Sequence, residues 1–139
     1  MKALKIDHVS FMVKDLDKAK KFFGELFETD FLEPWPIESI DILESVEPMG
    51  IDLVTPLTPG GLTQKVLTRR GEGVSMVSFK VPNLEEGMAE MESRGIRLLW
   101  HGTLADAEYA IYDPRDTFGV MIEIIEYKSY PMGANHLER

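Results

Sequence analysis

Three side chains that could hold a metal ion or move a proton lie inside apolar stretches of this 139-residue chain. They are His8, Asp52 and Glu123, each next to valine, isoleucine or leucine. A carboxylate is costly to bury without a partner, so each of the two acidic groups needs a polar contact. One histidine and two carboxylates can bind a divalent cation with coordination positions left open. The same groups can instead form a metal-free cluster in which His8 is hydrogen-bonded between the two carboxylates.

An internal repeat relates the positions of these side chains. Residues 6–17 are repeated as 74–85, and residues 51–55 return as 122–126. Two copies of one unit in a short chain indicate halves that are built alike and pack together.

The repeat pairs His8 with Met76, and Asp52 with Glu123. Polar groups at matched positions favour one shared site over three unrelated structural roles. The elements of the two repeats must then bring these groups together.

Hydrophobic periodicity predicts a strand, a helix and three strands in each repeat. Asp15 should begin the first helix, and Asn83 should begin the second, which ends at Gly95. The expected strands are 6–13, 31–35, 40–44, 50–55, 74–81, 96–100, 108–112 and 120–127, and a short helix is expected at 62–70. We expect a single domain over 1–139, with a first repeat at 5–56, a connector at 57–73, a second repeat at 74–127 and a tail at 128–139.

Side chains alternate along a strand, so each predicted strand has two different faces. The uniformly apolar face, with Phe11 and Phe79, should be covered by the helices. The mixed face should form a small-molecule site, in which a few polar groups converge on apolar walls. The side chains expected to contact the ligand there are Ser10, Met12, Met76, Ser78, Lys80 and Met121.

Composition excludes several classes of function. A net charge of −9 argues against a nucleic-acid partner, because binding phosphates needs a basic face. No apolar run approaches the roughly 20 residues that cross a bilayer, so no membrane partner is expected. The chain has no cysteine, which favours a cytoplasmic location and excludes a thiolate metal site. Any metal would need nitrogen and oxygen ligands.

The strand–helix–three-strand order, written twice, resembles the vicinal oxygen chelate superfamily. This superfamily includes glyoxalase I, methylmalonyl-CoA epimerase, extradiol dioxygenases, fosfomycin-modifying enzymes and bleomycin-resistance proteins. Among these members, the sequence looks most like methylmalonyl-CoA epimerase in the segments 51–56, 71–79 and 113–123. The local motifs that carry the resemblance are Asp7-His8-Val9, Gly71-Glu72-Gly73, and Asp113-Pro114 followed by Gly119 and Ile122-Glu123.

The resemblance implies an α+β fold, with two tandem βαβββ units whose sheets form a half-open, barrel-like cleft. It also implies four ligand positions, one on the first and one on the last strand of each unit. In this chain those positions are His8, Asp52, Met76 and Glu123. Met76 stands where the enzymes commonly carry histidine, and its thioether is a poor ligand for the ions of this superfamily. His8, Asp52 and Glu123 are therefore the expected metal ligands.

The chemistry implied is that of an isomerase or lyase acting on a small carbonyl or carboxylate compound in the cleft. A divalent ion (zinc, manganese, cobalt, nickel or iron) would act as a Lewis acid towards an enolate-like intermediate. A carboxylate would move the proton, with Glu123, Asp52 and Glu44 as the candidates. Extradiol oxygenation is disfavoured, because its two-histidine, one-carboxylate pattern lacks the second histidine.

Two other functions remain open. One is a metal-free binding module of the bleomycin-resistance kind, favoured by the replacement at Met76 and by the adaptable surface that several methionines provide. The other is a metal-free enzyme that uses His8 and the carboxylates for acid–base work. In each case the partner is a small-molecule ligand. We also expect a homodimer, favoured by exposed strand edges such as 40–44.

Overall fold

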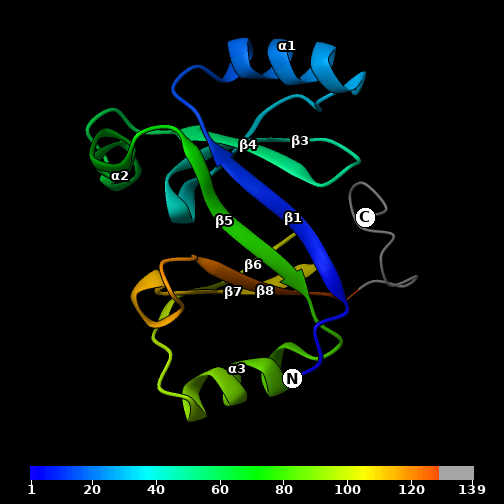
Figure 1. The fold of residues 1–139 in the computed structure, drawn as a ribbon, viewed down its shortest axis with the longest axis vertical. Helices are drawn as coiled ribbons and strands as arrows, with labels where there is room; N and C mark the ends of the chain where they lie inside the picture. The colour runs from blue at the N-terminus through cyan, green and yellow to red at the C-terminus, as the bar shows by residue number, and fades with distance from the viewer. Residues whose placement is uncertain (129–139) are drawn as a thin grey trace. The chain divides into compact units, whose positions relative to one another are not determined.

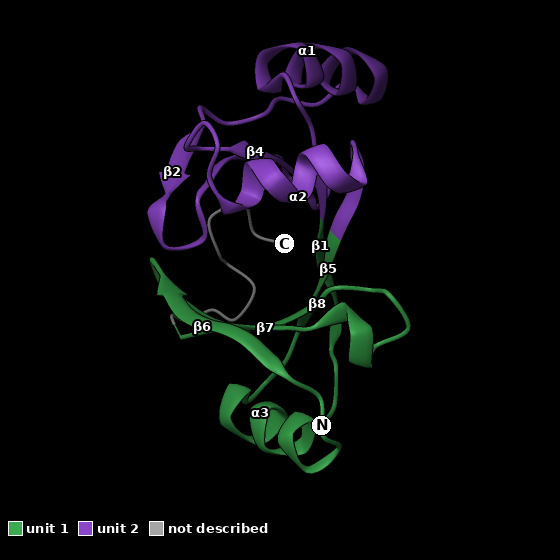
Figure 2. Ribbon diagram, turned by 90° about the vertical axis from the view of Figure 1, so that its left-hand side faces the viewer, with its two compact units in different colours: residues 1–9, 76–139 green, residues 10–75 purple. Residues whose placement is uncertain are grey.

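The computed structural model describes residues 1–128, which form two compact units (Figure 2). Unit 1 contains residues 1–9 and 76–128, and unit 2 contains residues 10–75. Two strands pass from one unit into the other along the chain: β1 (Lys5–Met12) and β5 (Gly73–Lys80). The predicted tail at 128–139 lies outside the described residues except for its first residue.

The elements follow the predicted order of strand, helix and three strands, twice (Figure 1). The mixed fold of two tandem βαβββ repeats is therefore confirmed. The first repeat is β1, α1 (Leu16–Phe27), β2 (Trp35–Ile37), β3 (Ile42–Val46) and β4 (Ile51–Pro56). The second is β5, α3 (Leu84–Ser93), β6 (Leu98–Leu104), β7 (Ala107–Tyr112) and β8 (Ile122–Tyr127), and α2 (Leu62–Arg70) lies between the repeats.

Strand pairing orders the elements within each unit. In unit 2 the order is β2-β3-β4-β1, with antiparallel pairing of β2 with β3 and of β3 with β4. In unit 1 the order is β5-β8-β7-β6, in which β5 and β8 are parallel and the other pairs are antiparallel. The strands β1 and β5, which both units share, are neighbours in the sheet order.

Capping residues begin both long helices as predicted. The Asp15 side chain accepts a hydrogen bond from the Lys18 backbone N–H at 3.0 Å, and Asn83 accepts one from the Glu86 N–H at 3.0 Å. Each bond satisfies one of the N–H groups that a helix start leaves without an intrahelical acceptor. Gly95 follows α3 with a φ of 73°, a conformation that glycine adopts without strain.

Each unit has a core between its helix and the helix-facing side of its strands. In unit 2, Phe11, Val13 and Leu53 pack with Leu16 and Phe23 of α1. The ring centroids of Phe11 and Phe23 lie 5.4 Å apart. The prediction that Phe11 faces the helix is confirmed.

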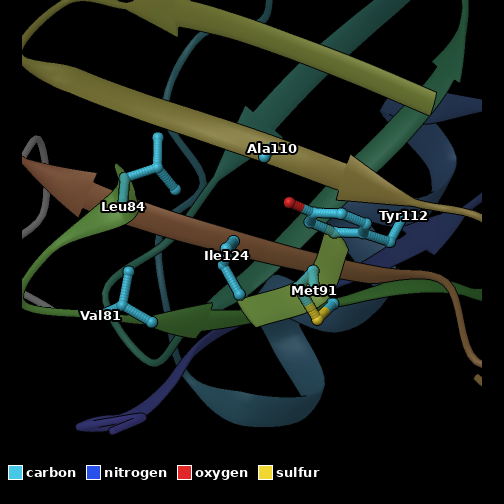
Figure 3. Close-up of a cluster of buried hydrophobic side chains, with 6 residues drawn as sticks. All are labelled: Val81, Leu84, Met91, Ala110, Tyr112 and Ile124. Carbon is cyan, nitrogen blue, oxygen red and sulfur yellow. The ribbon is translucent and has the colours of Figure 1, made fainter. Parts of the chain in front are cut away.

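In unit 1, the corresponding core lies between α3 and the strands β7 and β8 (Figure 3). Phe79 of β5 packs against this core. The prediction for Phe79 is likewise confirmed. The buried side chains of this core are Val81, Leu84, Met91, Ala110, Tyr112 and Ile124. Of the described helices, none is both long enough and apolar enough to cross a membrane.

Three strand predictions were wrong in position. The second strand was expected at 31–35 but forms at 35–37, the third was expected at 40–44 but forms at 42–46, and the sixth was expected at 96–100 but forms at 98–104. Pro36 lies within β2 because β2 is an edge strand, where a missing N–H donor is tolerated. Because β2 covers one side of β3 and β4 covers the other, β3 is not the exposed edge that was expected at 40–44.

Candidate functional site

His8 is the centre of a buried polar cluster in unit 1. Its ring is 6% exposed and lies on β1. The Nδ1 atom is 2.8 Å from Asp7 Oδ2, and the Nε2 atom is 3.5 Å from Glu123 Oε1. The structure thus brings together two of the three predicted metal ligands, His8 and Glu123, within one unit.

Glu123 is positioned by the parallel pairing of β5 with β8, in which Ser78 lies opposite it. The Ser78 hydroxyl donates a hydrogen bond of 2.6 Å to Glu123 Oε1, the same oxygen that faces His8. Both side chains are buried. A buried carboxylate needs such donors to offset its lost hydration.

Asp7 and Tyr127 complete this cluster, and the sequence analysis did not identify either as a site residue. The Tyr127 hydroxyl donates a hydrogen bond of 2.7 Å to Asp7 Oδ2, the oxygen that also contacts His8 Nδ1. The signal for Asp7 was its place directly before His8. Tyr127 lies on the same side of β8 as Glu123, two alternations further along the strand.

Lys80, a predicted ligand-contacting residue, is also buried in unit 1. Its Nζ atom lies 5.1 Å from the centre of the Tyr127 ring, a distance suited to a cation–π contact. Burial lowers the pKa of Lys80 and repulsion from Lys5 lowers it further, while the charge of Asp7 opposes both effects. The Lys80 ammonium is therefore easier to neutralise than that of an exposed lysine.

Met76 and Met121, two predicted ligand-contacting residues of unit 1, pack on the sheet face that α3 does not cover. They contact a buried cluster that contains Tyr109, Ile111 and Ile125. Phe79 packs in the other cluster, against α3, so the predicted alternation holds in β5. Ile111 lies opposite Glu123 in the register of β7 and β8, which places Glu123 on this same face.

Unit 2 holds the remaining predicted acidic residues. Glu44 lies opposite Val54 and Asp52 lies opposite Val46, so both carboxylates are on the same face of β3 and β4. Both are buried, with Asp52 2% exposed. Leu53, which alternates with Asp52, packs against α1. The acidic pair is therefore on the face of unit 2 that α1 does not cover.

Ser10 and Met12, the predicted ligand-contacting residues of β1, are buried in unit 2. They alternate with Phe11, which packs against α1. They consequently lie on the uncovered face of β1, as the alternation predicted.

Among residues 1–128, no group of three histidine, aspartate or glutamate side chains stands arranged to hold a metal ion. The donor pair in unit 1 nevertheless fits one. Two ligands about 2.1 Å from an ion, at a tetrahedral angle, are about 3.4 Å apart. His8 Nε2 and Glu123 Oε1 are separated by 3.5 Å. Imidazole nitrogen and carboxylate oxygen are also the donors that divalent ions of this kind prefer.

A second histidine, His101 on β6, belongs to a different environment. Its Nε2 atom is 2.8 Å from Glu108 Oε1, and both side chains are partly exposed. A hydrogen bond from His101 and, to a smaller extent, one from Lys128 lower the pKa of Glu108. His101 lies opposite Ala110, a member of the α3 core, so it is on the α3 side of its strands.

The chain is similar in sequence to known proteins and similar in structure to solved ones. The protein is 24% identical to YqjC of Bacillus subtilis over 96% of this chain and 97% of that protein. It is 28% identical to lactoylglutathione lyase of Schizosaccharomyces pombe, over 69% of this chain but only 39% of the lyase. A solved methylmalonyl-CoA epimerase from Mycobacterium tuberculosis superposes with a TM-score of 0.80 at 25% identity, covering 90% of this chain and 89% of the epimerase.

The family assignment depends on a match to a family as a whole. The sequence profile of the glyoxalase/bleomycin resistance protein/dioxygenase superfamily matches residues 7–112, which include most of β1 and the second repeat as far as the end of β7. This is the grouping that the doubled strand–helix–three-strand order resembled. The chain therefore belongs to the glyoxalase/bleomycin resistance protein/dioxygenase superfamily.

Proposed function

We propose that the protein is an isomerase or lyase of the epimerase and glyoxalase kind, which uses a divalent ion to act on a small carbonyl or carboxylate compound. The observation that carries the proposal is the 3.5 Å separation of His8 Nε2 and Glu123 Oε1 in a buried setting. Two electron-pair donors at this distance suit a shared cation. The ion would supply Lewis-acid stabilisation of the oxyanion that develops on the substrate.

The side chains of the protein divide between holding the ion and moving a proton. His8 and Glu123, which lie together in unit 1, are the proposed ligands. A carboxylate moves the proton between the substrate carbon and an enolate-like state, and Glu44, Asp52 and Glu123 are the candidates. A general base must lie within hydrogen-bond reach of the proton that it removes.

The substrate class follows from the relatives and from the buried faces. One relative is named for methylmalonyl-CoA and another for lactoylglutathione. Both names describe an acyl group carried on a larger thiol. We propose an acyl thioester with an acidic hydrogen beside its carbonyl, held in unit 1 by polar contacts from Ser78 and Lys80 against Met76 and Met121.

Metal binding is tested by titrating Mn²⁺, Co²⁺ and Zn²⁺ into chelator-treated protein and following the heat of binding. The wild type should bind one ion per chain. His8→Gln and Glu123→Gln should each weaken binding by about 10-fold or more, because each removes one ligand. His101→Gln is the matched control and should leave the affinity unchanged. Wild-type affinity no greater than that of an unrelated acidic protein would contradict the proposal.

Turnover is tested separately, by incubating the metal-loaded protein with methylmalonyl-CoA or a related acyl thioester in D₂O. Deuterium should enter at the carbon beside the carbonyl, as seen by mass spectrometry. Glu44→Gln should slow this exchange while leaving the metal affinity intact. Exchange at the rate of protein-free solution, across several thioesters, would contradict the proposed chemistry.

Metal-free ligand binding is the second candidate function, and Met76 is the observation that favours it. Met76 occupies the position of an expected ligand and packs with Met121 against the cluster around Tyr109. Flexible methionines suit a surface that accommodates varied apolar ligands. This candidate predicts ligand affinity that is equal in the presence and absence of a chelator. The lack of cysteine fits a cytoplasmic location for either function.

A further inference from the structure

Asp7 contacts His8 in a way that regular strand geometry does not predict. The two residues are neighbours on β1, so their side chains should point to opposite faces. Instead, Asp7 Oδ2 lies 2.8 Å from His8 Nδ1. The same oxygen accepts the hydrogen bond from Tyr127, whose position in the chain is 120 residues away. Two donors from different strands therefore converge on one buried carboxylate oxygen.

The chemistry of this contact defines the hydrogen on the His8 ring. The Nδ1 atom lies 2.8 Å from Asp7 Oδ2, whereas Nε2 lies 3.5 Å from Glu123 Oε1, so Nδ1 is the ring nitrogen better placed to donate a hydrogen bond to a carboxylate. In a neutral imidazole the other nitrogen, Nε2, then bears a lone pair. We propose that Asp7, held in place by Tyr127, is a positioning residue that keeps His8 in the Nδ1–H form and directs its Nε2 lone pair towards Glu123.

Glu123 is held in a complementary way on the other side of the ring. The Ser78 hydroxyl donates to Oε1, the oxygen that faces Nε2. The result is a continuous series of side chains in unit 1, running from Tyr127 through Asp7, His8 and Glu123 to Ser78. In a neutral ring with Nδ1 protonated, the Nε2 lone pair faces Glu123 Oε1 across 3.5 Å, and a cation or a proton between the two atoms would be stabilised.

The inference extends the proposed function, because a ligand histidine whose second nitrogen is hydrogen-bonded to a carboxylate is a better oriented and more basic ligand. Its central claim, however, concerns a tautomer of the protein without metal or substrate. The two can therefore fail independently, and the experiments separate them.

The tautomer is tested by nuclear magnetic resonance on protein labelled with ¹⁵N in its histidines, free of metal and at a pH where the rings are neutral. A His136→Gln background leaves two rings to assign. His8 should show a protonated Nδ1 and an unprotonated Nε2. His101 should show the reverse, since its Nε2 is the atom that contacts the Glu108 carboxylate. A protonated Nε2 on His8 would overturn the inference.

Two variants test the cause of the tautomer. In Asp7→Ala the acceptor is gone, so the His8 signals should move towards a mixture of tautomers while the His101 signals stay unchanged. In Glu108→Ala, the His101 signals should move towards a mixture of tautomers while the His8 signals stay unchanged. If Asp7→Ala left the His8 signals in place, Asp7 would not be the residue that positions the ring.

Tyr127→Phe provides a milder second variant, because it removes one hydroxyl and keeps the ring. His8 should retain a protonated Nδ1, but the signal of that proton should broaden as Asp7 becomes less restrained. An unfolded Asp7→Ala protein would still leave this variant and the wild-type tautomer as decisive measurements. An unaltered proton signal in Tyr127→Phe would contradict the role given to Tyr127.

Metal affinity then connects the tautomer to the proposed function. Asp7→Ala should weaken divalent-ion binding by about 10- to 100-fold, the usual cost of losing a partner behind a ligand. Glu108→Ala should not weaken it. A wild type with the expected tautomer but no metal affinity would overturn the metal-dependent function and leave the positioning role intact. Metal affinity that survived in Asp7→Ala would overturn the positioning role alone.

Discussion

At the scale of single residues, Met76 distinguishes the two candidate functions. Its thioether replaces the expected imidazole, and it lies on the uncovered face of β5 with Ser78 two residues further along. If the protein is a metalloenzyme, Met76→His should tighten an existing affinity for Mn²⁺, Co²⁺ or Zn²⁺. If the protein is a metal-free binder, the same change should create affinity where none existed.

Calorimetric titration of the wild type and Met76→His separates these outcomes. Met121→His is the control, because it adds an imidazole to the same apolar cluster at a position that the repeat does not match to a ligand. We expect the wild type to bind metal, since the buried carboxylates of Asp7 and Glu123 both lie beside His8 and are costly to keep charged without a cation. Equal gains in affinity from Met76→His and Met121→His would show that position 76 has no special relation to the site.

At the scale of secondary-structure elements, the helix caps should contribute measurably to the free energy of unfolding. Asn83→Ala removes the acceptor for the Glu86 N–H at the start of α3 and should lower the free energy of unfolding by about 1 kcal/mol. Asn83→Asp keeps a side-chain oxygen at that place and should lose much less. Urea unfolding followed by circular dichroism measures both. Equal stabilities of the wild type and Asn83→Ala would contradict the role of the cap.

The elements also show which local signals were informative. Alternation identified the two faces of β1 and β5, because Phe11 and Phe79 pack against helices while their neighbours do not. The positions of β2 and β6 were not predictable in the same way. Segment 31–34 does not form a regular strand, and its hydrogen bonds go to β3. The Leu32 N–H donates to the Val46 carbonyl oxygen, and the Leu32 carbonyl oxygen accepts a hydrogen bond from the Ser45 hydroxyl. Such bonds depend on distant residues and leave no periodic pattern in the sequence.

At the scale of the whole molecule, we expect a homodimer. Within residues 1–128 several large apolar side chains are well exposed, among them Phe22, Leu26 and Phe118. Burying such groups against a second chain removes apolar surface from water. Light scattering coupled to gel filtration should give twice the chain mass of 15.8 kDa. A monomeric mass at micromolar concentration would contradict this expectation.

Repeat, alternation and capping can be read directly from the chain, and they sufficed to predict the doubled strand–helix–three-strand order and the sheet faces on which His8 and Glu123 lie. The superfamily itself was predicted from the resemblance of that order and of the local motifs to a known family. They could not reveal that Asp7 turns towards its neighbour, or that Tyr127 and Ser78 supply the hydrogen bonds of the cluster. Those contacts arise from strand pairing between distant segments, such as the parallel register of β5 with β8. A buried polar group takes whichever partner the register places beside it, and that register is set by the packing of the entire sheet.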